Sequence, residues 1–149
     1  MHRGGAERDF LRLAERLRVP VVTTVDAKGL FPMDHPLHMG IHMGPFSPPA
    51  IEQRVREADL VLALGTVLTD MNLGASRPQV RRDRSVWAVD GRVNVSFHTY
   101  TDVMLPEFVA ALARERLPRF RETVAYHDDL VRPGARDDAP LSVNDLLLE

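Results

Sequence analysis

A five-residue apolar run, Leu60–Leu64, constrains the fold of this chain more than any other feature of its sequence. Gly65 closes the run, and a short segment with an apolar face, residues 51–58, comes directly before it. Such a run is typical of a parallel strand that is covered on both faces. A sheet built from strands of this kind needs helices on both sides. The run therefore predicts an α/β fold.

The N-terminal part of the chain shows the same alternation of helix and strand. Apolar residues recur at helical spacing between Ala6 and Arg18, and Pro20 ends that segment. The β-branched run Val21–Val25 follows and predicts a buried strand. Residues 30–49 contain many prolines and glycines, which forbid a long regular element there. Ser47 followed by Pro48 marks the start of the next helix, with Ser47 as the expected cap.

The second half of the chain predicts two further strands, Ser85–Asp90 and Arg92–Ser96, and an amphipathic helix over residues 105–112. The connections are long enough for parallel crossovers. We therefore predict a Rossmann-like three-layer parallel sheet. His98 and Tyr100 are expected in a turn, as packing residues, and Trp87 is expected in the core.

Gly4 and Gly5, directly before the first predicted helix, resemble the glycine turn that joins a strand to a helix in such folds. Only three residues, 1–3, precede them. The sheet is therefore expected to be short of its first strand, or the chain to begin inside a domain.

Composition narrows the class of protein. The 149 residues carry a formal net charge of −2. The chain therefore lacks the excess of positive charge that attracts nucleic acid or an anionic membrane. Cysteine is absent, so disulfides and thiolate metal sites are excluded. No apolar run approaches the ~20 residues of a membrane span, and residues 1–10 are too polar for a signal peptide. We expect a cytoplasmic protein that binds neither nucleic acid nor membrane.

Weak candidates for a nucleotide-binding loop follow the predicted strands, where such folds bind ligands. They are Gly65, Thr66, Asp70 and Gly74 after the apolar run, and Asp90 after the next strand. A glycine allows a phosphate to approach the backbone closely, and an acidic side chain can accept hydrogen bonds from a ribose. We favour an ordinary strand-to-helix connection as the explanation of the first four residues, and a plain turn before Gly91 explains Asp90 equally well.

Three histidines, His35, His38 and His42, superficially have the spacing of metal ligands. The prolines and glycine among them oppose a helix that would bring their side chains together, and no cysteine completes a coordination sphere. We predict no metal site. No serine stands in a G-x-S-x-G context, so no catalytic residue is predicted either.

Four segments together resemble the central domain of the thiamine-diphosphate enzymes, which include pyruvate and indolepyruvate decarboxylases and acetolactate synthases. Their order and spacing both fit, and the resemblance covers about residues 4–117. The last ten residues, PLSVNDLLLE, resemble the opening of the next domain in that family. The four segments are LAERLRVPVVTT (13–24), KGLFPMDHPLHMG (28–40), EADLVLALGTVLTDMNLG (57–74) and AVDGRVNVSFHTYTDVMLPEF (88–108).

The resemblance implies a domain organisation. Residues 1–120 would be an N-terminally truncated central domain, 121–139 a linker, and 140–149 the start of the following cofactor-binding domain. In that family the strand before the first helix lies inside the sheet, next to the strand at Val21–Val25. Its absence would leave the neighbouring strands unpaired and the domain marginally stable.

The resemblance also implies a function. In that family, thiamine diphosphate and magnesium are held by the N- and C-terminal domains, and no GDG motif occurs here. The string TVLTDMNLG is closer to the decarboxylases, whose central domain is largely structural, than to the flavin-binding synthases. We therefore expect a central, non-catalytic domain of a 2-oxo acid decarboxylase-like lyase, inactive and without cofactor on its own. Its expected partners are the two other domains and further copies of itself. The alternative is a stand-alone nucleotide-binding or regulatory module.

Overall fold

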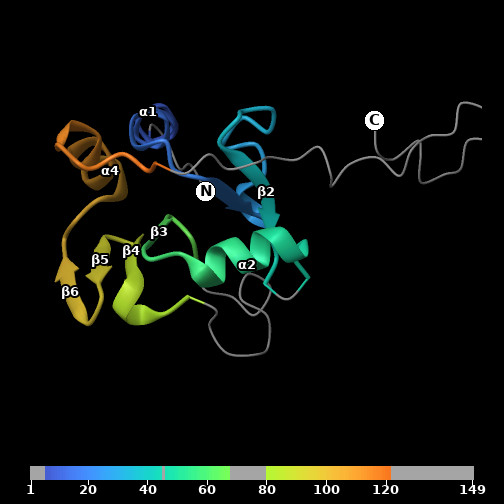
Figure 1. The fold of residues 1–149 in the computed structure, drawn as a ribbon. Coiled ribbons are helices and arrows are strands. Elements are labelled where there is room, and N and C mark those ends of the chain that lie inside the picture. The colour runs from blue at the N-terminus through green and yellow to red at the C-terminus, as the bar shows by residue number, and fades with distance from the viewer. Residues whose placement is uncertain (1–5, 45, 68–79, 122–149) are drawn as a thin grey trace, which may run out of the picture.

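The computed structural model describes residues 6–44, 46–67 and 80–121 (Figure 1). These residues form α-helices and β-strands, with two short 3-10 helices, 25–27 and 82–84, between them. The main elements are α1 (Glu7–Leu17), β1 (Val21–Thr24), β2 (His38–His42), α2 (Pro49–Glu57), β3 (Val61–Leu64), β4 (Ser85–Val89), β5 (Arg92–Val95), β6 (His98–Thr101) and α4 (Leu105–Arg114).

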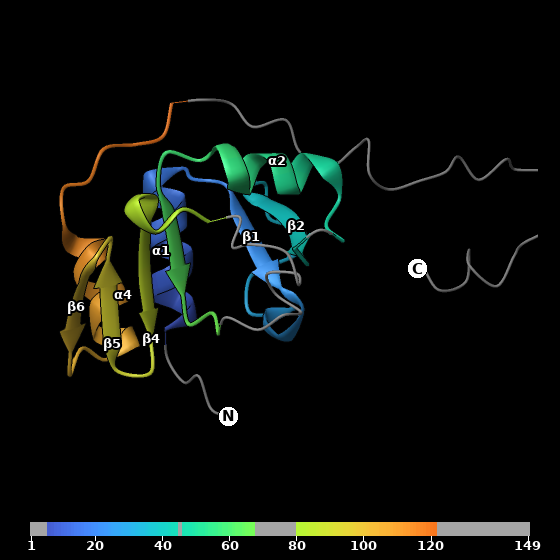
Figure 2. The same ribbon diagram turned by 90° about the horizontal axis from the view of Figure 1, so that it is seen from below.

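The described strands form two sheets with helices on both faces. β1 pairs with β2 in parallel, and a four-stranded sheet has the order β3-β4-β5-β6. Helices α1 and α4 lie on one face of the strands and α2 on the other (Figures 1 and 2). The α/β, Rossmann-like fold class is confirmed. None of the helices in the described ranges is long and apolar enough to cross a bilayer.

Pairing in the larger sheet is mixed, which corrects the expectation of parallel crossovers throughout. β3 and β4 are parallel, but β4 pairs antiparallel with β5, and β5 antiparallel with β6. Asp90 and Gly91 form the turn between β4 and β5, with φ of 51° and 71°. Two consecutive residues with positive φ are typical of a tight hairpin turn, which can join only antiparallel strands.

Strand β6 lies where a turn was expected. His98 and Tyr100 are not packing residues, because β6 is exposed along its whole length and Tyr100 is 55% exposed. Asn94 and Thr99 join β5 to β6 through a 2.7 Å hydrogen bond between their side chains. A short polar strand at the edge of a sheet has no apolar alternation, so its sequence carries little strand signal.

Strand β2 lies within the segment that was predicted to be irregular. It pairs with β1 in a register that shifts between Val21 and Val22, and Gly40 adopts a φ of 127° there. His38 is 2% exposed, and its Nε2 lies 3.1 Å from Thr23 Oγ1 on β1. Backbone pairing with β1 therefore decides the structure of this segment.

The buried core consists of two clusters on either side of α1. Leu13 and Leu17 pack with Val109 of α4, whereas Ala14 packs with Val21 of β1 and Phe31. Because α1 contributes side chains to both clusters, it ties β1 to the half of the domain that contains α4. The predicted helix over 6–18 is confirmed within a residue at each end.

Two local expectations need correction. Leu60–Leu64 is only half-buried: all four residues of β3 have intermediate exposure, and Leu60 is 56% exposed. Among the described strands β3 is paired on one side alone, which leaves part of its surface open. Ser47 does not cap α2; its Oγ accepts a 2.8 Å hydrogen bond from the Met43 backbone N–H, and Pro48 occupies the cap position.

Candidate functional site

A narrow groove of about 110 Å³ lies between the carboxyl ends of β1 and β3, beside the N-terminus of α1. Both strands are drawn as arrows that run in the same direction across Figure 2. Gly65 and Thr66, two of the predicted nucleotide-loop residues, line this groove. Its other walls are mostly apolar and include Phe10, Val22, Phe31, Leu64, Leu105 and Val109.

Gly65 ends β3 in a conformation that favours glycine, with a φ of 69°. Its N–H donates to the Ala88 carbonyl of β4 at 2.8 Å. A Cβ at this position would lie only 3.0 Å from Cδ2 of Leu105, which packs on the core cluster around Val109. The close approach of α4 therefore already explains why a glycine stands here.

Thr66 is held by the half-buried Trp87 of β4, whose Nε1–H donates to the Thr66 carbonyl at 2.9 Å. An indole N–H in a partly buried place needs such an acceptor. Trp87 thus anchors the loop after β3. Sequence reasoning placed Trp87 in the core but missed this contact, because the two residues are 21 positions apart.

Replacing Gly65 by alanine is expected to destabilise the protein more than replacing Gly29, another glycine with positive φ. Gly29 has a φ of 85° and nothing within 4 Å of an added Cβ. Gly29→Ala therefore measures only the cost of placing alanine in this backbone conformation, a loss of about 1–2 kcal/mol in the free energy of unfolding. Gly65→Ala adds the displacement of Leu105, about 1 kcal/mol more. Urea unfolding of both variants measures the difference. Equal losses would contradict the packing role of Gly65.

The remaining loop candidates do not join the groove. Asp90 is exposed at the tip of the β4–β5 hairpin and is not among the residues that line the groove. Asp70 and Gly74 lie outside the described residues. A nucleotide site at these positions stays a prediction.

Two of the three histidines, His35 and His38, have structural contacts of their own. His38 packs against Phe31, with 5.9 Å between the ring centroids, in addition to its contact with Thr23. His35 accepts a 3.1 Å hydrogen bond from the Leu37 N–H, and its Nε2 lies 3.4 Å from a Glu15 carboxylate oxygen. Within the described ranges, no group of three or more histidine, aspartate or glutamate side chains is placed to hold a metal ion.

The groove does not fit thiamine diphosphate. A magnesium diphosphate needs several oxygen ligands and cations around it, whereas Glu7 is the one ionisable residue among the groove's described lining. At about 110 Å³ the groove is also well below the size of ordinary cofactor pockets. No catalytic step can therefore be derived from its residues.

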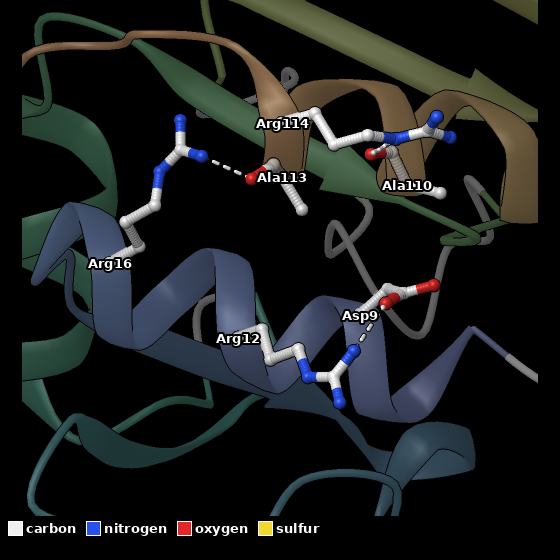
Figure 3. Close-up of a pocket in the computed structure, with 6 residues that line it drawn as sticks. All are labelled: Asp9, Arg12, Arg16, Ala110, Ala113 and Arg114. Carbon is white, nitrogen blue, oxygen red and sulfur yellow. Dashed lines mark hydrogen bonds and ion pairs between the residues drawn. The ribbon is translucent and has the colours of Figure 1, made fainter.

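A larger pocket of about 470 Å³ lies between α1 and α4. Figure 3 shows its six lining residues: Asp9, Arg12, Arg16, Ala110, Ala113 and Arg114. Sequence analysis did not identify this pocket. A usable signal was the i, i+4 spacing of Arg12 and Arg16, which places both guanidinium groups on one face of α1.

The arginines around β4 are engaged locally. Arg81 donates two hydrogen bonds, of 3.1 and 2.6 Å, to the Asp83 carboxylate, and these bonds lower the pKa of Asp83 below its ordinary value. The guanidinium of Arg82 lies 5.6 Å from the centre of the Phe97 ring and donates to the Ser96 carbonyl. These contacts are ordinary for a solvated surface.

Known proteins are similar in sequence to this chain. Residues 1–109 match the family model described as "Thiamine pyrophosphate enzyme, central domain". An indole-3-pyruvate decarboxylase of Azospirillum brasilense is 33% identical over 153 aligned residues, which cover 97% of this chain and 28% of that protein. Pyruvate decarboxylase 1 of Oryza sativa subsp. indica is 30% identical over 147 residues, covering 93% of this chain and 24% of that protein.

A probable acetolactate synthase large subunit of Methanocaldococcus jannaschii is 41% identical over 73 residues, which cover 49% of this chain and 12% of that protein. The chain thus spans about a quarter of the length of the two decarboxylases, and the family model covers well over half of the chain. By sequence, this chain belongs to the family of thiamine pyrophosphate enzyme central domains.

Proposed function

We propose that the chain is a non-catalytic central domain of a thiamine-diphosphate-dependent 2-oxo acid decarboxylase. The observation that carries this proposal is the use of the strand-end loop for packing: Leu105 closes on Gly65, and Trp87 holds Thr66. In many α/β folds a ligand enters at this edge of the sheet. Here the contacts at this edge hold α4 and the loop after β3 against the four-stranded sheet, as a structural domain requires.

The parent reaction, on this proposal, is the non-oxidative decarboxylation of a 2-oxo acid, as the names of the decarboxylase relatives suggest. Thiamine diphosphate supplies the nucleophilic carbon and the electron sink in such chemistry. Both the cofactor and magnesium would be bound by other domains, which are the proposed partners of this chain. Its own part would be to support the assembly of those domains and of further copies.

The isolated chain is expected to release no carbon dioxide from pyruvate, indolepyruvate or benzoylformate above a cofactor-only blank. Thiamine diphosphate and magnesium are supplied in excess. No activity is expected because catalysis depends on positioned groups, which a non-catalytic domain does not provide. The assay measures carbon dioxide over several hours. Release above the blank, abolished when the chain is boiled, would overturn the proposal.

A calorimetric titration separates this proposal from a nucleotide-binding module of the same fold. Adenosine nucleotides, flavin and coenzyme A should produce no heat of binding, because the groove beside Gly65 and Thr66 is small and mostly apolar. Binding that is lost in Thr66→Val would instead support the nucleotide module.

A further inference from the structure

Strand β6 is an open edge of the four-stranded sheet. It pairs with β5 on one side, and no other described strand pairs with it. In both views it lies at the outer end of the sheet, away from β1 and β2 (Figures 1 and 2). All four of its residues, His98 to Thr101, are exposed. An exposed strand edge of this kind is a template for pairing with another strand.

The hairpin geometry fixes which backbone groups of β6 point outward. Val95 and His98 pair across a two-residue turn, so the His98 N–H faces β5. In an antiparallel pair, the backbone groups of successive residues point alternately toward the partner strand and away from it. The groups of Tyr100 therefore also face β5. The N–H and C=O groups of Thr99 and Thr101 point outward, where a further strand can meet them.

Beyond its shortness, β6 lacks the features that usually keep edge strands apart. Lysine, proline and bulges protect many natural sheet edges. β6 contains no proline, lysine or arginine, and its register with β5 has no shift. Phe97 directly before the strand and Met104 shortly after it are apolar and more than half exposed. Covering such side chains in an interface would stabilise strand pairing.

We propose that two copies of this chain pair through β6, antiparallel and with Tyr100 on the two-fold axis. Such an axis, perpendicular to the sheet, places one residue opposite its own copy. With Tyr100 there, Thr99 of one copy lies opposite Thr101 of the other, and each such pair exchanges two backbone hydrogen bonds. All the outward groups of β6 are then used. A register centred on Thr99 would instead pair Thr101 with Phe97, which belongs to the turn.

The same register brings complementary polar groups together. His98 of one copy lies next to Asp102 of the other, and the symmetry repeats this contact at the opposite end of the pair. Both side chains are exposed, and Asp102 directly follows β6. An imidazole N–H can donate to a carboxylate oxygen, and this bond is strong when the acceptor is charged. Between positions 98 and 102 no like charges face each other, so a second copy is the partner that this edge matches.

This pairing deepens the proposed role in assembly and rests on it, but the two can fail separately. Release of carbon dioxide by the isolated chain would overturn the non-catalytic role and leave the pairing through β6 intact. A chain that stays monomeric would overturn the pairing and leave the non-catalytic role intact.

Sedimentation of the full chain over a range of concentrations tests the pairing, and we expect a reversible monomer–dimer equilibrium. Thr99→Pro should weaken the dimer about tenfold or more, because the symmetry removes two intermolecular hydrogen bonds at once. The bonds to β5 remain, since the Thr99 N–H points away from that strand. Thr99→Val is the matched control: it also loses the side-chain hydrogen bond to Asn94 but keeps the backbone N–H, so the dimer should persist.

Cysteine substitutions test the register, because the chain has no cysteine of its own. Tyr100→Cys should form an intermolecular disulfide on mild oxidation, since Cα atoms about 4.5 Å apart in a non-hydrogen-bonded pair suit a disulfide. Thr101→Cys is the control. Its two copies would lie two positions out of register, beyond the Cα separation of about 7 Å that a disulfide can bridge.

Sedimentation as a monomer at every concentration would overturn the proposal and leave β6 open to a strand of another protein domain. A dimer that Thr99→Pro leaves as stable as the parent would also overturn it, and Thr101→Pro provides the same comparison if Thr99→Pro does not fold. Equal crosslinking of the two cysteine variants would overturn the register centred on Tyr100.

Discussion

Phe31→Ala is expected to lower the free energy of unfolding by about 3–5 kcal/mol. Phe31 is 1% exposed and is the largest fully buried side chain described. Its ring meets Phe10 of α1 edge-on, with centroids 5.8 Å apart, and meets His35 in the same manner at 5.1 Å. Truncation removes these contacts and opens a cavity between α1 and β1. A domain of this size holds only about 5–15 kcal/mol in total, so the variant should be close to unfolding at 37 °C.

Phe46→Ala is the matched control, because Phe46 is 81% exposed and the same atoms are removed. Its unfolding free energy should stay within about 0.5 kcal/mol of the parent. Urea denaturation of both variants, followed by circular dichroism, measures the difference. Equal stability of the two variants would show that Phe31 does not lie in the core.

A short β-branched strand added before His2 is expected to raise the melting temperature by about 5–10 °C. β1 and β3 each pair on one side only among the described strands, and the apolar groove lies between their ends. α1 already spans both sheets, so a new strand leading into α1 would complete a parallel β-α-β unit of the usual hand. Each new ladder bond contributes about 0.5–1.5 kcal/mol net.

An extension of the same length with proline at every second position serves as the control, since proline cannot donate to a ladder. Calorimetry gives the melting temperatures, and light scattering shows whether the strand extension also converts aggregates into a defined oligomer. Identical melting temperatures for the two extensions would contradict the idea that the groove accepts a strand. So would a parent chain that already unfolds sharply as a monomer at high temperature.

Local patterns were sufficient for most of the elements. The helical spacing of Phe10, Leu13 and Leu17 correctly predicted α1, because one face of that helix packs on both core clusters. The β-branched run after Pro20 correctly predicted β1. These elements have an apolar periodicity that reports directly which face is buried. The order and spacing of the segments also indicate the family without any tertiary contact.

Long-range contacts decided what the local patterns left open. β2 forms in a segment rich in proline and glycine because β1 supplies its hydrogen bonds. Phe31, in the connection between β1 and β2, is buried because it packs against Phe10 of α1. No local pattern indicates a partner many residues away.

The sequence by itself determined the fold class, the family and the positions of α1, β1, α2, β3 and α4, because burial periodicity and turn residues are local properties. Tertiary structure alone decided that Gly65 is crowded by Leu105 and that Arg16 buries an unpaired Nη2 beside α4. In both cases the two elements are separated by about forty residues or more, and the contact exists only once α4 has packed against β3 and α1. Side chains acquire such roles from the packing of distant helices, which no short window of sequence encodes.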